Sequence, residues 1–168
     1  MPHAPEIQRL LDEQAIQKVL FDYCHAVDRC DAEGIRNAFH EDGTDDHGVF
    51  KGTAKDFVTW VVPFLLKNYV SSMHPITNFR FRIDGDVART ECYVAPVLKR
   101  RDDTGEYLDC SGGRYIDRLE RRNGVWKIAH RKFIRDWRET RKVAPPATPD
   151  VYQYGVRSKE DPSYWNDE

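Results

Sequence analysis

The sequence predicts an α+β domain in which a curved antiparallel sheet wraps around N-terminal helices, and three observations lead to this fold class. Apolar residues recur at intervals of three and four through the first part of the chain, as on one face of a helix. Long runs rich in β-branched and aromatic residues then follow, separated by turn sequences, as in an antiparallel meander. With 168 residues and 40% hydrophobic content, the chain can bury one core, so we expect a single domain.

Helical periodicity predicts three helices before the sheet. The first spans residues 10–27, where apolar side chains follow one face. Its opposite face carries charged residues: Asp12, Glu13, Lys18 and Asp22. A short helix is expected over residues 32–39, and residues 43–50 then indicate a strand or a loop. A third helix begins near Thr53 and ends near Tyr69, and Pro63, which lacks a backbone donor, should kink or split it.

Turn sequences divide the following residues into four antiparallel strands. The turns fall at residues 84–86, 102–105 and 123–124, which are rich in Asp, Asn and Gly. The strands are therefore expected over residues 74–83, 87–100, 106–121 and 125–137. Because most strands have only ~5 to 6 residues, a flat sheet of such long strands is not expected. Gly112 and Gly113 lie in mid-strand and mark a natural site for a bend or a bulge.

The C-terminal part of the chain follows neither a helical nor a strand pattern. It contains prolines, many charges and four aromatic residues: Tyr152, Tyr154, Tyr164 and Trp165. We therefore expect one domain over residues 1–137 and an extended, proline-rich arm over residues 138–168. Two interpretations of the arm stay open: it is a flexible tail, or it packs on a neighbouring subunit or covers the mouth of a pocket.

Composition and charge argue against several classes of partner. Lys and Arg (26) nearly balance Asp and Glu (28), and a net charge of −2 offers no basic surface for nucleic acid or anionic membranes. The N-terminal residues lack the pattern of a signal peptide, and no apolar run reaches the ~18 residues of a membrane span. We therefore expect a cytoplasmic protein whose ligand is a hydrophobic small molecule.

No cofactor or metal site is predicted. The sequence lacks the motifs of serine hydrolases, dinucleotide-binding proteins and P-loop proteins. Its cysteines show no metal-binding spacing and are expected to be reduced thiols: Cys24, Cys30, Cys92 and Cys110. Asp45, Asp46 and His47 look like metal ligands, but adjacent residues of an extended segment point to opposite faces and cannot all bind one ion.

Three residues of the sequence offer proton-transfer chemistry. Tyr23 lies on the apolar face of the first predicted helix, Asp28 lies at the edge of that face, and His74 stands in the segment SSMHP. Histidine, with an ordinary pKa of about 6.5, acts as acid or base near neutrality, and a carboxylate partner fixes its tautomer. The alternative for Asp28 is that it only ends the helix.

The direction of the His74 side chain is a difficulty for this pairing. Simple strand alternation groups His74 with Arg80 and Arg82, which conflicts with a buried histidine. A twist or bulge in residues 75–78 would reconcile the two, and otherwise His74 is a surface histidine. In the last strand, Arg131 and Arg135 alternate with aromatic residues and can either hold an oxyanion or leaving group, or belong to a solvated face.

Several segments together resemble the SnoaL-like branch of the nuclear transport factor 2-like superfamily. They are AIQKVLFDYCHAVDRCD (15–31), GTAKDFVTWV (52–61), SMHPITNF (72–79), GGRYIDRLERRNGVWKI (112–128) and RDW (135–137). Their order and spacing are more specific than any one of them, and the similarity covers residues 6–137. This resemblance implies a cone-shaped α+β barrel, in which helices close one side of a curved sheet around a deep apolar cavity.

Within this family, the chain is most similar to scytalone dehydratase, bile-acid 7α-dehydratase and hexachlorocyclohexane dehydrochlorinase, which eliminate water or chloride without a cofactor. The resemblance implies that His74 is the base, that Asp28 orients it, and that Tyr23 assists. It places Arg135 at the site by analogy with the bile-acid enzyme, or Arg131 by analogy with the dehydrochlorinase. The candidate residues lining the cavity are Phe50, Trp60, Phe64, Leu65, Tyr69, Tyr93, Cys110 and Tyr115.

The first functional hypothesis is therefore a cofactor-independent, dehydratase-like lyase acting on a hydrophobic cyclic or aromatic compound. An aspartate of the bile-acid enzyme falls at Pro96 here, which argues against a bile-acid substrate. The same fold also implies alternatives: a lyase that releases formaldehyde from lignin-derived diaryl compounds, and a polyketide cyclase or isomerase. A further class is a ligand-binding protein or a non-catalytic assembly subunit, such as the small subunit of a ring-hydroxylating dioxygenase. The family resemblance favours a homotrimer, with a dimer as the alternative.

Overall fold

A computed structural model describes residues 4–144, 148 and 151–165 of the chain. The helices within these residues are α1 (Pro5–Asp28), α2 (Ala32–Ala38), α3 (Ala54–Asn68) and the short 3-10 helix η1 (Pro162–Tyr164). The strands are β1 (Phe39–Asp46), β2 (Lys51–Thr53), β3 (Ser71–Met73), β4 (Ile76–Asp84), β5 (Val87–Val94), β6 (Val97–Asp102), β7 (Gly105–Arg122) and β8 (Val125–Lys142).

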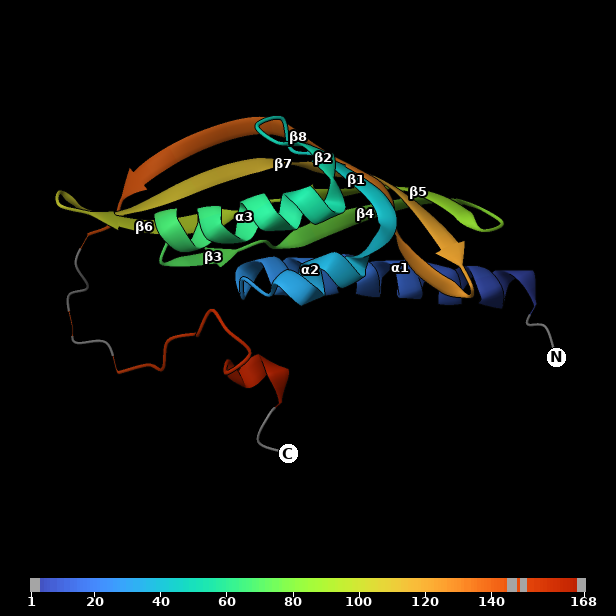
Figure 1. The fold of residues 1–168 in the computed structure, drawn as a ribbon, viewed down its shortest axis with the longest axis horizontal. Helices are drawn as coiled ribbons and strands as arrows, with labels where there is room; N and C mark the ends of the chain where they lie inside the picture. The colour runs from blue at the N-terminus through green and yellow to red at the C-terminus, as the bar shows by residue number, and fades with distance from the viewer. Residues whose placement is uncertain (1–3, 145–147, 149–150, 166–168) are drawn as a thin grey trace.

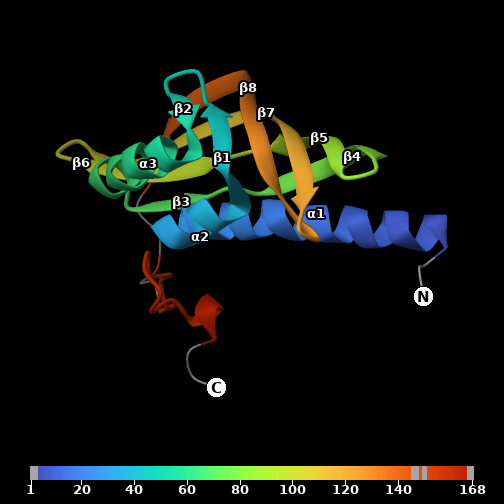
Figure 2. The same cartoon turned by 45° about the vertical axis from the view of Figure 1, so that its right-hand side comes forward.

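The strands form one curved, open sheet that arches over the helices (Figure 1). Its main path runs β2-β1-β8-β7-β5-β4, while β6 pairs with β7 and β3 pairs with β6. All strand pairs are antiparallel except β1 with β8, which is parallel. The predicted fold class is therefore confirmed: α+β, with a curved sheet that the helices fill from one side (Figure 2).

The predicted number of strands and some of their boundaries were wrong. The expected strand over residues 87–100 is broken between β5 and β6, where Pro96 has no amide proton for a ladder and where the Pro75 carbonyl accepts from the Ala95 amide. β1 begins at Phe39, where the second helix was expected to end, because α2 ends one residue earlier. β8 continues five residues beyond the expected end, to Lys142, since β7 is long enough to pair with it.

Pro63 does not split α3, which runs unbroken from Ala54 to Asn68, so of the two expected outcomes the split is wrong. Proline costs a helix one backbone hydrogen bond, but α3 is held by tertiary packing of a buried face that includes Phe57, Val61 and Leu65. The Thr53 hydroxyl caps the helix by accepting from the Asp56 amide at 3.1 Å. A helix with an uninterrupted inner face therefore closes one side of the sheet.

The sequence predicted that Asp12 lies on a solvated face of α1, but the structure places it elsewhere. It is buried, and its carboxylate accepts from Arg121 at 2.6 Å and from the indole of Trp126 at 3.1 Å. Buried carboxylates need such partners, which here come from the paired strands β7 and β8. The interaction fixes α1 against the sheet at the end away from the helix C-terminus.

A bulge in β8 bends the longest strand pair at the predicted glycines. Gly112 pairs with Trp137 and Gly113 with Arg135, so Asp136 is an extra residue in β8. A Cβ atom on Gly113 would lie 2.2 Å from the Ile134 carbonyl oxygen, which is fixed in the ladder. The close approach of the two backbones therefore requires glycine at position 113.

We expect Gly113→Ala to lower the free energy of unfolding by about 2–3 kcal/mol, because the backbone must shift to admit the methyl group. Gly112→Ala is the matched control. The three atoms nearest its methyl group all belong to the half-exposed Trp137 indole rather than to backbone, so a cost below about 1 kcal/mol is expected if the indole turns away. Urea denaturation of both variants measures the difference, and equal costs would contradict this explanation of the bulge.

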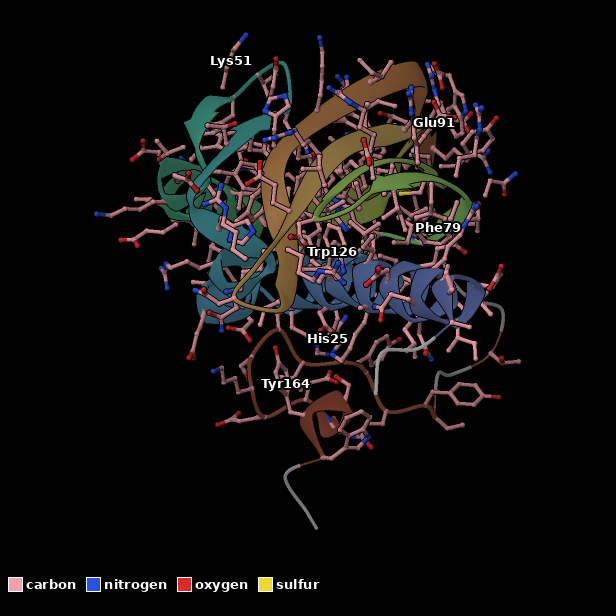
Figure 3. The ribbon with its side chains drawn as sticks, turned by 90° about the vertical axis from the view of Figure 1, so that its right-hand side faces the viewer. His25, Lys51, Phe79, Glu91, Trp126 and Tyr164 are labelled. Carbon is pink, nitrogen blue, oxygen red and sulfur yellow. The ribbon has the colours of Figure 1, made fainter. Side chains whose placement is uncertain are left out.

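Residues 151–165 fold back onto the face of α1 that points away from the sheet, and Figure 3 shows Tyr164 beside His25. The Tyr164 hydroxyl donates to Asp31 at 3.0 Å, and Arg29 donates to Asp161 at 2.9 Å. None of these described residues lines the cavity presented below, so the expected cover over a pocket mouth is not observed. Packing on a neighbouring subunit stays a prediction.

Asp161 organises this docked segment. Its carboxylate accepts from the Ser163 hydroxyl at 2.6 Å, from the Val156 amide at 2.7 Å and from Arg29. These donors hold the pKa of Asp161 well below its usual range, so the carboxylate stays charged in mildly acidic solution. The docked segment is therefore expected to persist through that pH range.

We expect Asp161→Ala to release residues 151–165 from α1, because four hydrogen-bonding and charge contacts lose their shared acceptor. Limited trypsin digestion, followed by mass spectrometry, should then show faster cleavage after Arg157, whose scissile bond is not next to residue 160 or 161. The neighbouring carboxylate Glu160 is exposed, and Glu160→Ala is the control that should leave cleavage unchanged. Equal cleavage rates in all three proteins would contradict the role of Asp161.

Candidate active site

A cavity of about 340 Å³ lies between α3, the end of α1 and strands β6–β8. Most of the residues predicted to line it do so: Trp60, Phe64, Leu65, Tyr69, Cys110 and Tyr115. Tyr93 does not, because its side chain points to the outer surface of β5 and is half exposed. Phe50 does not either, because it stacks behind Trp60 with ring centroids 5.4 Å apart.

His74 and Asp28 form a hydrogen-bonded pair in the wall of this cavity. Asp28 is the last residue of α1, and its two carboxylate oxygens accept from Nδ1 of His74 at 2.6 Å and from the His74 backbone amide at 2.9 Å. Because a carboxylate only accepts, Nδ1 carries a proton, so in the neutral imidazole the lone pair is on Nε2. Asp28 therefore does more than end a helix: it orients an imidazole that lines the cavity.

A local distortion explains why His74 escapes the surface face of the strand. His74 precedes the first residue of β4, Asn78 has a φ of 55°, and the β4–β5 register shifts between Thr77 and Arg80. The distortion separates the direction of His74 from that of the exposed arginines further along β4. The bulge that the sequence required in residues 75–78 is thus observed.

Arg131 does not line the cavity, contrary to the expectation that it faces a substrate. It is fully buried and donates from Nε and Nη2 to the two oxygens of Asp117 at 2.8 and 2.7 Å. Its guanidinium carbon lies 4.1 Å from the ring centroid of Tyr23 and 4.0 Å from that of Tyr115. Arg131 therefore sits behind these two rings, because Asp117 on the adjacent strand holds it there.

Tyr23 and Tyr115 present their rings to the cavity with Arg131 behind them. Burial raises the pKa of the Tyr23 phenol well above its usual range, and this effect outweighs the opposing field of Arg131. Burial, reinforced by the neighbouring Tyr23, raises the pKa of Tyr115 in the same way. Both phenols therefore stay protonated, and Tyr23 is available as a hydrogen-bond donor rather than as a base.

Arg135 lines the cavity as predicted, and it is joined by Arg138, which the sequence placed in the arm. The extra residue Asp136 explains this, because a bulge reverses strand alternation and turns Arg138 to the side of Arg135. The same wall contains Asp109 and Ser111. One end of the cavity is consequently polar, whereas Trp60 and Phe64, stacked with centroids 5.2 Å apart, form a flat aromatic wall.

His47 and Asp45 form a second imidazole–carboxylate pair that was not predicted. His47 lines the cavity, and its Nδ1 contacts Oδ1 of the fully buried Asp45. The imidazole stacks between Phe57 and Phe133, with ring centroids at 4.9 and 5.5 Å. The sequence contains a signal for this pair, since residues two apart in a strand share a face, whereas the metal-site prediction for residues 45–47 depends on all three.

The thiols and acidic side chains of the described residues form neither a reactive-cysteine site nor a metal site. All four cysteines are free, and burial raises the pKa of Cys24 and of Cys92 to about 12, which keeps both as unreactive thiols near neutrality. In the part of the chain that the structure describes, no three His, Cys, Asp or Glu side chains cluster to hold a metal ion. The polar side chains that line the cavity therefore include two imidazoles, three phenols, two guanidinium groups and the Asp109 carboxylate.

Comparisons with known proteins agree with this architecture. The sequence profile of the SnoaL-like domain matches residues 8–132. The uncharacterized protein Rv2910c of Mycobacterium tuberculosis is 27% identical over 128 residues, which cover 74% of this chain and 86% of that protein.

Two solved structures share the fold at lower identity. A putative scytalone dehydratase from Novosphingobium aromaticivorans superimposes with a TM-score of 0.69 at 18% identity, covering 87% of this chain and 97% of that one. The hexachlorocyclohexane dehydrochlorinase LinA-type3 from Novosphingobium barchaimii gives a TM-score of 0.71 at 21% identity, covering 84% and 99%. At these identities the likeness establishes the fold, and function has to be argued from the site.

Proposed function

This chain belongs to the SnoaL-like domain family, and we propose that it is a lyase that eliminates a small group from a hydrophobic cyclic or aromatic compound without a cofactor. One observation carries the proposal: Asp28 fixes His74 so that Nε2, with its lone pair, faces a cavity wide enough for such a compound. An imidazole oriented in this way removes a proton from carbon at neutral pH.

The walls of the cavity support a substrate with a flat apolar part and an oxygen at one end. Trp60 and Phe64 provide the aromatic surface. Tyr23 offers a protonated phenol, and Arg135 and Arg138 offer cationic donors toward the charge that develops on a carbonyl oxygen as the proton leaves. Two structural neighbours, one described as a putative scytalone dehydratase and one as a hexachlorocyclohexane dehydrochlorinase, bear the names of elimination enzymes.

A turnover screen by mass change tests the proposal. The protein is incubated with aryl β-hydroxy ketones, starting with 4-hydroxy-4-phenylbutan-2-one, and products are followed by mass spectrometry. Elimination of water predicts a mass loss of ~18 Da. A formaldehyde-releasing lyase, which would use the same proton-abstracting base, predicts a loss of ~30 Da from a hydroxymethyl diaryl compound. No protein-dependent mass loss in any compound of the panel would contradict a lyase.

The proposal extends to the assembly and the location of the protein. In residues 4–144, 148 and 151–165, no helix is both long enough and apolar enough to cross a membrane. We propose a cytoplasmic homotrimer, with a homodimer as the alternative, because several large apolar side chains, among them Met73, Leu66 and Trp137, stay exposed on the single chain. Light scattering after size-exclusion chromatography distinguishes these states from a monomer.

A further inference from the structure

Two imidazole–carboxylate pairs open onto one cavity from different elements of the fold. His74 and Asp28 come from the segment before β4 and from the end of α1, while His47 and Asp45 come from β1 and the turn after it. In both pairs the carboxylate contacts Nδ1, so Nε2 is the ring nitrogen available to a ligand. A site with one base for one proton needs only one such pair.

The surroundings of the two carboxylates differ. Asp28 keeps a side-chain exposure of 16% and receives a second hydrogen bond from the His74 backbone amide. Asp45 is fully buried, and its Oδ2 has no hydrogen-bond partner among the residues that the structure describes. An isolated buried carboxylate is costly unless a positive charge compensates it, so Asp45 depends on its imidazole more than Asp28 does.

The cationic side chain paired in register with Asp45 is bound to another carboxylate. Asp45 pairs in register with Arg131 across β1 and β8, and Arg131 is already committed to both oxygens of Asp117. Among the described residues the Asp45 carboxylate contacts the His47 ring and has no cationic partner besides it, so an imidazolium at position 47 would form the ion pair that this buried carboxylate needs. The faces of Phe57 and Phe133 on either side of the ring also favour an imidazolium.

We propose that His47, positioned by Asp45, is a second catalytic residue: the acid that protonates a leaving hydroxyl while His74 acts as the base. This inference rests on the elimination proposed above and narrows its substrate class. Chloride leaves as a stable anion, whereas hydroxide is a poor leaving group and needs a proton. A dedicated acid in the cavity therefore points to a β-hydroxy carbonyl compound rather than a halide.

The proposed step balances its protons and electrons. Nε2 of His74 takes the proton from the carbon next to the carbonyl group, and the C–H electron pair forms the new C=C bond. The C–O bond on the neighbouring carbon breaks, its electron pair stays on oxygen, and that oxygen takes the proton from Nε2 of His47 and departs as water. Proton exchange with solvent then resets both histidines, one losing and one regaining a proton.

Two probes with one skeleton and different leaving groups test this assignment. They are 4-hydroxy-4-phenylbutan-2-one and 4-chloro-4-phenylbutan-2-one, which eliminate to the same conjugated ketone, whose ultraviolet absorbance gives both rates after subtraction of the spontaneous reaction. His47→Asn should lower kcat/KM for the hydroxyl compound by about 100-fold or more, but for the chloride by no more than about fivefold. His74→Asn should lower both to a similar extent.

Controls separate catalysis from stability. His130→Asn is the matched substitution on the adjacent strand, where His130 is exposed and bonds Thr44 outside the cavity, and it should change neither rate. Asp45→Asn should give the leaving-group selectivity of His47→Asn, as expected for a positioning residue. If His47→Asn fails to fold because Asp45 is left unpaired, the double variant Asp45→Asn/His47→Asn removes both buried charges and replaces it.

The possible failures are distinguishable. An equal loss for both probes in the His47 variants, or no loss for either, overturns the assignment of His47 as the acid while leaving elimination by His74 intact. If the unmodified full-length protein converts neither probe, elimination is contradicted for this compound class. The assignment of His47 as the acid is then contradicted as well.

Discussion

Replacing His74 by alanine is expected to lower kcat/KM for elimination by about 1,000-fold while leaving the fold intact. His74 supplies the only imidazole nitrogen that Asp28 directs into the cavity, and the protonated phenols of Tyr23 and Tyr115 cannot replace it as a base. The side chain lies in a connection before β4 and keeps 11% of its surface exposed, so its loss removes little core packing. Rates are measured by single-turnover formation of the dehydrated product, with the melting temperature as the check on folding.

Asp28→Asn probes the same pair without changing its shape. An amide can donate a hydrogen bond to Nδ1, which would move the ring proton to Nε2 and give the wrong tautomer for a base. We expect a loss of about 100-fold or more in kcat/KM. His130→Ala, outside the cavity, is the control for removing an imidazole. Full turnover by folded His74→Ala and Asp28→Asn proteins would show that the pair is not the catalytic base.

The sequence could predict the pair of Asp28 and His74 but not the geometry that joins them. Helical periodicity placed Asp28 at the edge of a buried face, and the need for a distortion after His74 was recognised from strand alternation. The distortion itself depends on a positive φ at Asn78 and a shifted register with β5, which are properties of the assembled sheet. Local pattern therefore identified the residues, whereas tertiary structure decided their direction.

The errors at the site have the same physical origin. Alternation along the last strand gave Arg131 and Arg135 one face, but it could not show that Asp117, on the neighbouring strand, would bind Arg131 behind two tyrosine rings. Arg138 was assigned to the arm because the extra residue in β8 reverses the alternation before it. The pair of His47 and Asp45 differs, since its spacing of two residues is common in strands and does not by itself distinguish a proton-transfer pair from two metal ligands.

The position of Arg131 changes what its substitution should do. A catalytic arginine at the cavity surface would affect turnover and leave stability nearly unchanged, whereas Arg131 is buried with both Asp117 oxygens bound to it. Removing one partner of such a pair leaves an uncompensated buried charge, which typically costs about 3–5 kcal/mol. Here the loss would be felt by two carboxylates, because Asp45 lies opposite Arg131 in the β1–β8 register.

We therefore expect Arg131→Met to lower the free energy of unfolding by about 3–5 kcal/mol, equivalent to a melting temperature lower by roughly 10 °C in a chain of this size. Asp117→Val should cost a similar amount, because the guanidinium is then left unpaired. The double variant Arg131→Met/Asp117→Val removes both charges. Its loss of unfolding free energy should be smaller, by at least about 2 kcal/mol, than the sum of the losses in the two single variants. Additive losses in urea denaturation would mean that the two side chains do not act as a pair, and single losses below about 1 kcal/mol would mean that the buried pair does not hold the sheet. Recovery of stability in the double variant, by contrast, would show that Arg131 and Asp117 act as one buried structural pair.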